Sequence, residues 1–128
     1  MCFYLQITKD AQTLSHRFSA DFPEAESLPY SIVNAFTFPL CPVITNTDTN
    51  IIQLYYWGLI PEWANDTDIR KFTLNARIET ISEKPAFRKS VHKRCIVIAN
   101  GFLEWKWLDP KGTRKQRYLV TSTEQEIF

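Results

Sequence analysis

The chain has 128 residues, enough for one domain that buries its own hydrophobic core, and a formal net charge of +1. Its apolar fraction of 45% and charged fraction of 23% are typical of globular proteins and exclude a disordered chain. No apolar run reaches the roughly 18 residues of a membrane span, and the start of the chain lacks the basic and apolar regions of a signal peptide.

The first half of the chain predicts strands and one helix around a proline-rich loop. Residues 1–8 and 51–57 are rich in aromatic and β-branched types, which predicts two strands. Residues 9–20 predict a helix with an apolar face. Residues 21–42 contain four prolines and predict a loop with short extended pieces, and a polar loop is expected at residues 65–68.

The second half predicts one further helix and a meander of strands. Residues 71–74 look strand-like, and residues 78–90 predict a helix that Pro85 kinks or splits. The hairpin pair Asn100-Gly101 and a second turn at 109–112 then separate three strands. These strands are expected at residues 94–99, 102–107 and 115–121, and the first of them is expected to be buried.

These elements indicate an α+β fold in a single domain, residues 1–128. Ile127 and Phe128 look like the first residues of another strand, and domains seldom end there. We therefore expect the domain to lack a C-terminal part. We expect a monomer; an incomplete sheet that a second copy completes is the alternative.

Positive charge is concentrated in one segment of the chain. The net charge is −5 for residues 1–83, +8 for residues 84–117 and −2 for residues 118–128. Cations that follow phosphates and rings that stack on bases suit single-stranded nucleic acid, whereas the alternative is a basic face that only contacts water. The aromatic residues among or next to these cations are Phe87, Phe102, Trp105, Trp107 and Tyr118.

The three cysteines, Cys2, Cys41 and Cys95, form no CxxC pair. The sequence therefore indicates neither a zinc site nor a disulfide framework, and we expect no metal and no cofactor. A reducing, cytoplasmic location is the simplest expectation. Cys41 and Cys95 are expected to be structural, and His16 and His92 to be surface residues of helices.

Cys2 follows the initiator methionine. If Met1 is removed, Cys2 carries an amine and a thiol on adjacent carbons. The amine, whose ordinary pKa is about 8, can condense with an aldehyde to an imine, and the thiol can then close a five-membered thiazolidine. In the alternative interpretation Cys2 is a small buried apolar side chain, and a retained Met1 blocks this chemistry.

Polar residues at two other places are candidates for chemistry. Strand alternation puts Glu104 on one face with Phe102 and Lys106. A carboxyl among aromatic rings suits proton transfer; alternatively, it only pairs with Lys106. The amide of Asn75 and the guanidinium of Arg77 can hold a hydroxyl and a phosphate, or Asn75 caps the predicted helix.

Six motifs occur in a characteristic order along the chain. They are Cys2 after Met1, WGLIPEW at 57–63, NARIET at 75–80, KPAF at 84–87, Arg94-Cys95 and NGFLEW at 100–105. With these motifs the chain resembles the SOS response-associated peptidase (SRAP) family, the abasic-site-processing proteins, over nearly its whole length. The resemblance implies a curved, barrel-like, mostly antiparallel sheet with flanking helices and a positively charged DNA groove.

The resemblance implies a function in the DNA damage (SOS) response, namely covalent capture of abasic sites in single-stranded DNA through a thiazolidine. It implies three catalytic residues: Cys2 as nucleophile and imine-forming amine, Asn75 to orient the cysteine terminus and the opened sugar, and Glu104 to move protons as the sugar ring opens. Removal of Met1 by the same nucleophile implies a peptidase (hydrolase) activity, beside a lyase-like activity at the abasic site.

The resemblance also implies contacts with DNA. Arg77 is expected to bind a phosphate, and Trp105 to stack on a base next to the abasic site. Arg88 and Lys106, from the basic segment, complete the expected DNA-binding set. No membrane partner is expected.

The chain departs from the family pattern in three places. Phe3-Tyr4 stands where the family usually has Gly-Arg, whose Arg binds phosphate, and residues 35–38 (AFTF) stand for the usual Ala-Pro-Thr-Gln. The family's histidine in a His-x-Arg-Met-Pro segment has no counterpart in these 128 residues. Two other functions therefore stay open: a thiol peptidase or amidase that uses Cys2 and Glu104, and a non-catalytic fragment that binds single-stranded DNA.

Overall fold

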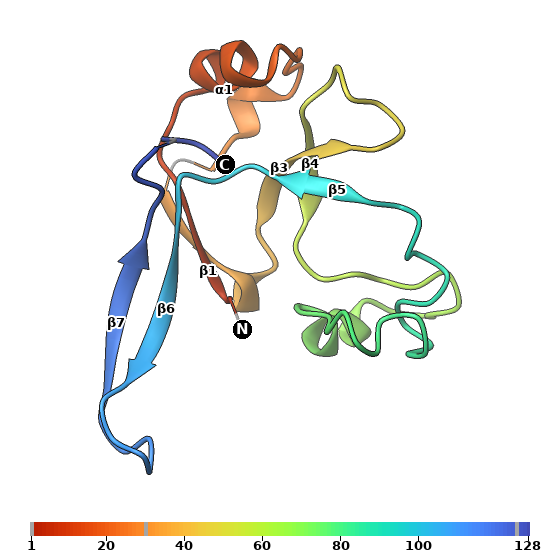
Figure 1. The fold of residues 1–128 in the computed structure, drawn as a ribbon. Helices are drawn as coiled ribbons and strands as arrows, with labels where there is room; N and C mark the ends of the chain where they lie inside the picture. Colours follow the sequence, from red (N-terminus) through yellow and green to blue (C-terminus); the bar gives the residue numbers. More distant parts are fainter. Residues whose placement is uncertain (1, 30, 125) are drawn as a thin grey trace.

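The computed structural model describes residues 2–29, 31–124 and 126–128. The strands are β1 Tyr4–Ile7, β2 Ser31–Asn34, β3 Leu40–Thr45, β4 Gln53–Tyr56, β5 Cys95–Val97, β6 Gly101–Trp107 and β7 Lys115–Val120. The helices are α1 Ala11–Phe18 and the 3-10 helices η1 Ala25–Ser27, η2 Ala35–Thr37 and η3 Asp68–Phe72. The strands form two antiparallel sheets, ordered β2-β1-β6-β7 and β4-β3-β5 (Figure 1). The predicted α+β fold is thus confirmed, while the described strands stay in two sheets and do not close into a barrel.

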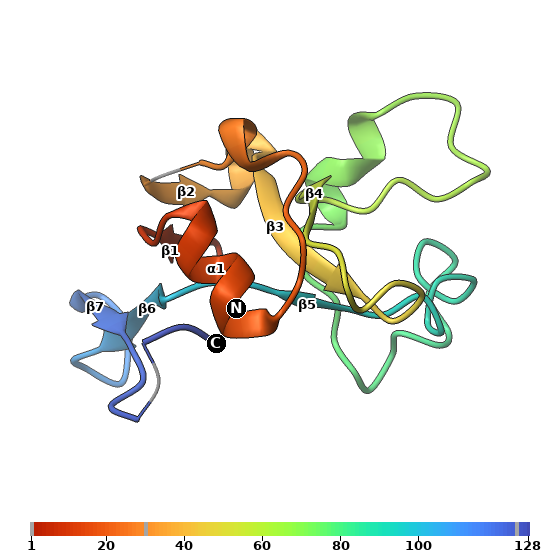
Figure 2. The same ribbon diagram turned by 90° about the horizontal axis from the view of Figure 1, so that it is seen from above.

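Helix α1 forms within the range that the sequence predicts and covers one end of the molecule. Asp10 caps its start by accepting hydrogen bonds from the backbone N–H and the hydroxyl of Thr13, both at 2.8 Å. The helix ends at Ser19, which has a left-handed backbone conformation. Seen from this end (Figure 2), α1 lies across the space between the two sheets, and it buries Leu14.

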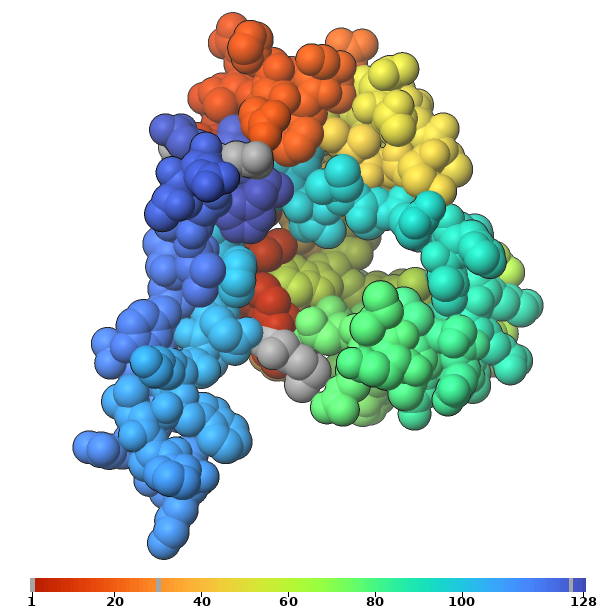
Figure 3. Space-filling model, viewed as in Figure 1, coloured from red at the N-terminus to blue at the C-terminus, as the bar shows by residue number. Residues whose placement is uncertain are grey.

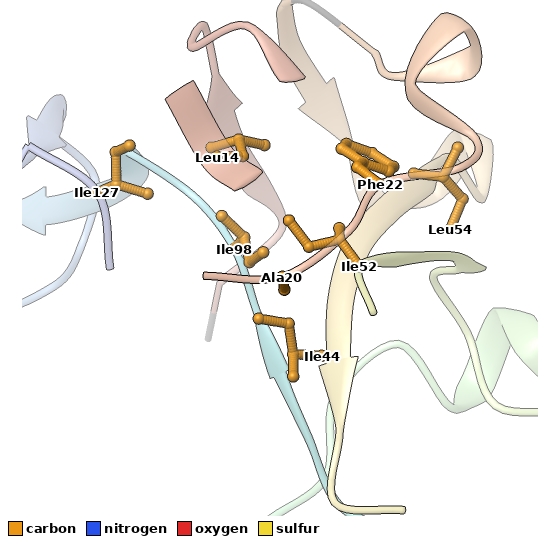
Figure 4. Packing of buried hydrophobic residues seen from close by; sticks show 8 residues of the cluster. All are labelled: Leu14, Ala20, Phe22, Ile44, Ile52, Leu54, Ile98 and Ile127. Carbon is orange, nitrogen blue, oxygen red and sulfur yellow. The ribbon is translucent and has the colours of Figure 1, made fainter. Parts of the chain in front are cut away.

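The main hydrophobic core joins α1 to the three-stranded sheet. Its buried members come from α1, β3, β4 and the segments next to the strands (Figure 4): Leu14, Ala20, Phe22, Ile44, Ile52, Leu54, Ile98 and Ile127. A second cluster joins β1 and β2 to β3, and its members are Ile7, Val33 and Cys41, packed against Leu5, Leu28 and Trp57. The second cluster fixes β1, and with it the start of the chain, against the three-stranded sheet.

The chain crosses from one sheet to the other between β5 and β6. Ile98 donates its N–H to the carbonyl of Pro42 in β3, and Asn100 donates its N–H to a carbonyl of β1, at 2.9 and 3.0 Å. The side chain of Asn100 forms two further hydrogen bonds with Thr8, at 2.8 and 3.0 Å. The hairpin predicted at Asn100-Gly101 is therefore wrong: β5 pairs with β3, and β6 pairs with β1 and β7.

Strands β3 and β5 also differ from the prediction. β3 begins inside the predicted loop of residues 21–42, and Pro42 fits there because its missing N–H faces Ile98, just past the end of the β5 ladder. β5 is shorter than the predicted strand at 94–99 and is exposed rather than buried, because it lies at the edge of its sheet. Ile98 and Ala99, which follow it, are the buried part of that range.

Residues 58–94 form an irregular segment on the side of the molecule away from β6 and β7 (Figures 1 and 2). The helix predicted at 78–90 is wrong. Separate turns replace it, closed for example by the N–H of Arg88 and the carbonyl of Lys84 at 2.9 Å, and Pro85 supplies no N–H to continue them. The strand-like interpretation of residues 71–74 is also wrong, because η3 covers the first two of these residues and the other two lie outside any strand.

Two negative findings apply to the described residues alone. None of their helices combines the length and the apolar character that crossing a membrane requires. Nor do they gather three or more His, Cys, Asp or Glu side chains into a group able to hold a metal ion.

Candidate active site

A cavity of about 1080 Å³ opens between β1, the three-stranded sheet and the 58–94 segment. Figure 3 shows the molecule hollowed between the N-terminal strand (red), the turns of the 58–94 segment (green) and the chain around β5 (cyan). The cavity combines a thiol, apolar walls and charged groups, supplied by Cys2, Val43, Trp57, Val97, Arg94 and the ion pair of Lys93 with Glu62 at 3.3 Å.

Cys2 lies half-buried on the wall of this cavity. Its thiol donates a hydrogen bond to the carbonyl of Tyr4 at 3.4 Å. Burial raises the pKa of the thiol above its ordinary value, and the negative charge of Glu104 raises it further. At neutral pH the thiol is therefore protonated, so its proton must leave as the sulfur reacts.

Glu104 lies on β6, half-buried, close enough to Cys2 for its charge to act on the thiol. Its Oε1 accepts a hydrogen bond from the N–H of Trp105 at 3.1 Å. β1 and β6 run antiparallel, with Leu5 opposite Phe102 and Gln6 opposite Gly101, so the start of the chain lies beside β6. The fold thus brings together two residues that lie about a hundred positions apart in the sequence.

Asn75 carries a buried amide nitrogen that has no hydrogen-bond partner in the described part of the chain. A buried donor without an acceptor costs about 1–3 kcal/mol, and Asn75 is not among the described residues that line the cavity. The alternative role of Asn75 as a helix cap is wrong, because the residues that follow it form turns rather than a helix.

Two contacts fix the backbone in front of Asn75. Trp57 donates its indole N–H to the carbonyl of Leu74 at 2.7 Å. Gly58, at φ +111°, packs so closely on the chain that a Cβ there would lie 2.9 Å from the Cβ of Arg70. Asn75 therefore belongs to a rigid frame that shares Trp57 with the cavity wall.

The unusual residues next to Cys2 form an aromatic contact. Phe3 stacks on Phe36 with the ring centroids 4.8 Å apart, and the carbonyl of Phe3 accepts a hydrogen bond from the N–H of Ala35 at 2.8 Å. The guanidinium of Arg70 lies 4.1 Å from the centre of the Phe38 ring. The two departures from the family pattern, at residues 3–4 and 35–38, therefore meet at one place beside Cys2.

The expected DNA-binding residues lie in two separate segments. Arg77 and Arg88 are exposed on the 58–94 segment, and Trp105 and Lys106 are exposed on β6. Because side chains alternate along a strand, Trp105 and Lys106 point to opposite faces of β6. Lys106 therefore shares the face of Glu104, and Trp105 does not.

Two basic residues of the cavity wall were not among the expected site residues. Lys93 and Arg94 line the cavity, and the N–H of Arg94 donates to Oδ1 of Asn46 at 2.9 Å. Their position in the segment of net charge +8 was the available signal, but the sequence alone did not show that this part of the segment faces Cys2.

The remaining cysteines and histidines were expected to be structural or to lie on the surface. Cys41 is buried, and burial raises the pKa of its thiol to about 12. Cys95 is exposed and lines the cavity, so its assignment to a buried strand is wrong. His16 on α1 and His92 are both exposed, but His92 lies in a turn rather than a helix.

Comparison with known proteins decides the family. The model of the family described as SOS response associated peptidase (SRAP) matches residues 1–128, which is the whole chain. The chain belongs to the SRAP family. The resemblance inferred from the motifs is therefore confirmed.

SRAP relatives exist in bacteria and animals. The abasic site processing protein YoqW of Bacillus subtilis is 40% identical over 132 residues, which cover 100% of this chain and 58% of YoqW. The abasic site processing protein HMCES of Mus musculus is 44% identical over 81 residues, which cover 59% of this chain and 22% of HMCES. A crystal structure of a Bacteroides thetaiotaomicron protein matches 99% of this chain and 57% of its own chain, with 37% identity and a TM-score of 0.86. The chain thus spans less than three fifths of the length of these SRAP relatives.

Proposed function

We propose that this SRAP chain captures abasic sites in single-stranded DNA covalently, through the amine and thiol of Cys2, in the cytoplasm. The observation that carries the proposal is the position of Cys2 on the wall of an open cavity, with its thiol under the influence of the Glu104 carboxylate. YoqW and HMCES are named abasic site processing proteins, which supports the choice of substrate.

The first step exposes the amine of Cys2. Its sulfur attacks the carbonyl carbon of Met1, the C–N bond to Cys2 breaks, and the thiol proton passes to the nitrogen. Water then hydrolyses the resulting thioester and releases methionine. In this proposal the peptidase activity acts once, on the chain itself.

The second step opens the sugar. An abasic deoxyribose is mostly a closed hemiacetal, and only its open form offers an aldehyde. Glu104 takes the proton of the C1′ hydroxyl and returns a proton to the ring oxygen as the bond between that oxygen and C1′ breaks. The unpaired amide N–H of Asn75 donates to an oxygen of the opened sugar, which satisfies the buried donor.

The third step joins protein and DNA. The amine of Cys2 attacks the aldehyde carbon, and the adduct loses water to give an imine. The sulfur then bonds to the same carbon while the thiol proton moves to the nitrogen, which closes the thiazolidine. Because burial raises the pKa of the Cys2 thiol, the thiol still holds the proton that this closure needs.

The remaining predicted residues hold the strand. Arg77 and Arg88 are exposed cations on the 58–94 segment that can bind phosphates, and Lys106 supplies a charge on the Glu104 face of β6. Trp105 stacks on a base next to the lesion. The lesion itself has no base, so no base has to be flipped out of a stack.

Crosslinking to an abasic oligonucleotide tests the proposal. The parent protein is incubated with single-stranded DNA that holds one abasic site, beside Cys2→Ala and the matched control Cys95→Ser, whose thiol lines the same cavity. We expect the parent and Cys95→Ser to form a covalent product that survives denaturing electrophoresis, and Cys2→Ala to form none. Equal crosslinking by Cys2→Ala refutes the mechanism, and salt-sensitive binding without any covalent product identifies a binding fragment instead.

A further inference from the structure

The β6–β7 ribbon, residues 101–120, projects from the body of the molecule (Figures 1 and 3). Its two strands are paired from Phe102–Val120 to Trp107–Lys115, and the turn between them closes with the N–H of Leu108 donating to the carbonyl of Arg114 at 2.9 Å. The outer half of this ribbon packs against no other strand of the described chain. Residues 105–107 and all of β7 are exposed, so both faces of this outer half are open to a partner.

One face of the ribbon alternates aromatic rings and cations. Trp105 is paired with Arg117, and Trp107 with Lys115, so all four side chains share a face. Each cation lies over the ring of its partner, at 5.9 Å for Arg117 and 5.5 Å for Lys115. The rings are nevertheless open to solvent, with exposed fractions of 49% for Trp105 and 62% for Trp107.

The carboxylates of the ribbon are kept away from this face. Glu104 points to the opposite face. Asp109 lies in the turn, where its side chain accepts hydrogen bonds from the N–H groups of Lys111, Thr113 and Arg114. These bonds, of which the one from Arg114 has the largest effect, hold the pKa of Asp109 below its ordinary value. The face with Trp105 and Trp107 thus presents rings and positive charge without a competing carboxylate from the ribbon.

Trp107 is held in place by the turn. Gly112 has φ +66° and lies against the indole, so closely that a Cβ on it would come within 3.0 Å of Cε3 of Trp107. Trp105 and Trp107 are two residues apart on one strand, a spacing of about 6.8 Å along the ribbon. That spacing leaves room for one flat ring system between or beside the two indoles.

We propose that this face is a stacking platform for the DNA that flanks the abasic site, in which Trp107 and Lys115 extend the contact at least one nucleotide beyond Trp105. The inference rests on the proposed function and goes further, because it assigns a path to the flanking strand. The charge of Glu104 reaches the thiol of Cys2, and Trp105 is the next residue along β6, so a lesion held at Cys2 lies close to the point where this face begins. Ring stacking together with nearby cations is the usual means of binding single strands without reading their sequence.

Non-covalent binding tests the platform separately from the chemistry. All variants are made in the Cys2→Ala background, and their affinities are measured for two abasic oligonucleotides, one with long flanks and one with a single nucleotide on each side. We expect Trp107→Ala to weaken binding of the long oligonucleotide about ten-fold and to reduce the affinity ratio of long to short. Lys115→Ala is expected to lower the slope of log affinity against log salt by about one ion.

Phe72→Ala is the matched control, because Phe72 is an aromatic side chain with 82% exposure on η3, far from the ribbon in the sequence. Trp107→Phe should restore most of the lost affinity, and thermal unfolding shows whether each variant is folded. A Trp107→Ala variant that is folded and binds the long oligonucleotide as tightly as its parent refutes the platform. If this face binds an extended acidic peptide and does not bind DNA, the platform is refuted and the face is assigned to a protein partner instead. If the protein with an intact Cys2 fails to crosslink, the proposed function is refuted. The non-covalent binding measurements still decide the platform in that case.

Discussion

Asn75 offers a test in which stability and function should change in opposite directions. Its amide nitrogen is buried and has no partner in the described part of the chain, so the free protein bears an unsatisfied donor. Replacement of Asn75 by Leu removes that donor and keeps a similar volume. An unpaired buried polar group costs about 1–3 kcal/mol, and the residue is only half-buried, so we expect Asn75→Leu to be about 1 kcal/mol more stable than the parent. For a chain of this size that is a rise in Tm of about 4 °C.

Asn100→Leu is the matched control for this prediction. Asn100 is also half-buried, but its side chain accepts a hydrogen bond from the N–H of Thr8 and donates one to its hydroxyl, at 2.8 and 3.0 Å. Leu at this position leaves the N–H of Thr8 without its acceptor, so we expect a loss of about 2 kcal/mol. The two substitutions are chemically identical and should move Tm in opposite directions.

Thermal unfolding and crosslinking rates are measured on the same preparations. If the orphan N–H of Asn75 serves the sugar, Asn75→Leu should crosslink an abasic oligonucleotide at least about ten-fold more slowly, because one hydrogen bond to the reacting molecule is lost. An Asn75→Leu protein that is less stable than the parent refutes the reading of Asn75 as an unsatisfied donor. An unchanged crosslinking rate shows that this donor does not serve the reaction.

Three other changes test the account at separate points. Glu104→Gln keeps the shape of the side chain but cannot carry a proton, so the crosslinking rate should fall about 10²- to 10⁴-fold; a rate equal to the parent's excludes Glu104 as the acid/base. Gly58→Ala should lower the free energy of unfolding by about 2 kcal/mol or more, measured by urea titration, because a Cβ at φ +111° would meet Arg70 at 2.9 Å; a neutral effect contradicts the rigid frame. Burial raises the pKa of Cys41 to about 12, above its value of roughly 8.5 in the unfolded chain, so the unfolded state ionises first as pH rises. Between about pH 9 and 12 the free energy of unfolding of the parent should fall relative to that of Cys41→Val by roughly 1.4 kcal/mol per pH unit. If the free energies of the two proteins change in parallel with pH, the raised pKa of Cys41 is refuted.

Local sequence patterns predicted an element correctly where the interactions that form it come from its own residues. Helix α1 lies in the predicted range because Asp10 supplies its cap and Leu14 its buried face. The turn between β6 and β7 was predicted from its own residues, and there Asp109 accepts the N–H groups of the turn. In both cases the interactions that fix the element lie within a few residues of it.

Prediction failed where distant contacts decide the conformation. Asn100-Gly101 has the composition of a tight hairpin, but the side chain of Asn100 is bound to Thr8, which lies 92 positions away. Likewise, nothing near Pro42 shows that its missing N–H falls beyond the end of the β5 ladder. Sequence reasoning weighs only local preference at such positions, whereas long-range pairing determines the structure.

The candidate site shows the same difference between what the sequence predicts and what only the fold reveals. The identities of Cys2, Asn75 and Glu104 came from the family motifs, but the sequence could not show that the charge of Glu104 reaches the thiol or that the Asn75 nitrogen is unpaired. The stacking of Phe3 on Phe36 was also missed, since the two residues belong to departures from the family pattern that are 33 positions apart. Such pairs become visible only when the fold brings the segments together.

The most direct test of the central claim is to locate the DNA adduct by mass spectrometry after tryptic digestion of the crosslinked protein. The account predicts that the adduct lies on the peptide of residues 2–9, that this peptide begins with Cys2 without Met1, and that its mass gain equals the DNA remnant less one water. An adduct on a lysine of the basic segment or on Cys95, or a crosslinked peptide that still carries Met1, would contradict capture through the amine and thiol of Cys2.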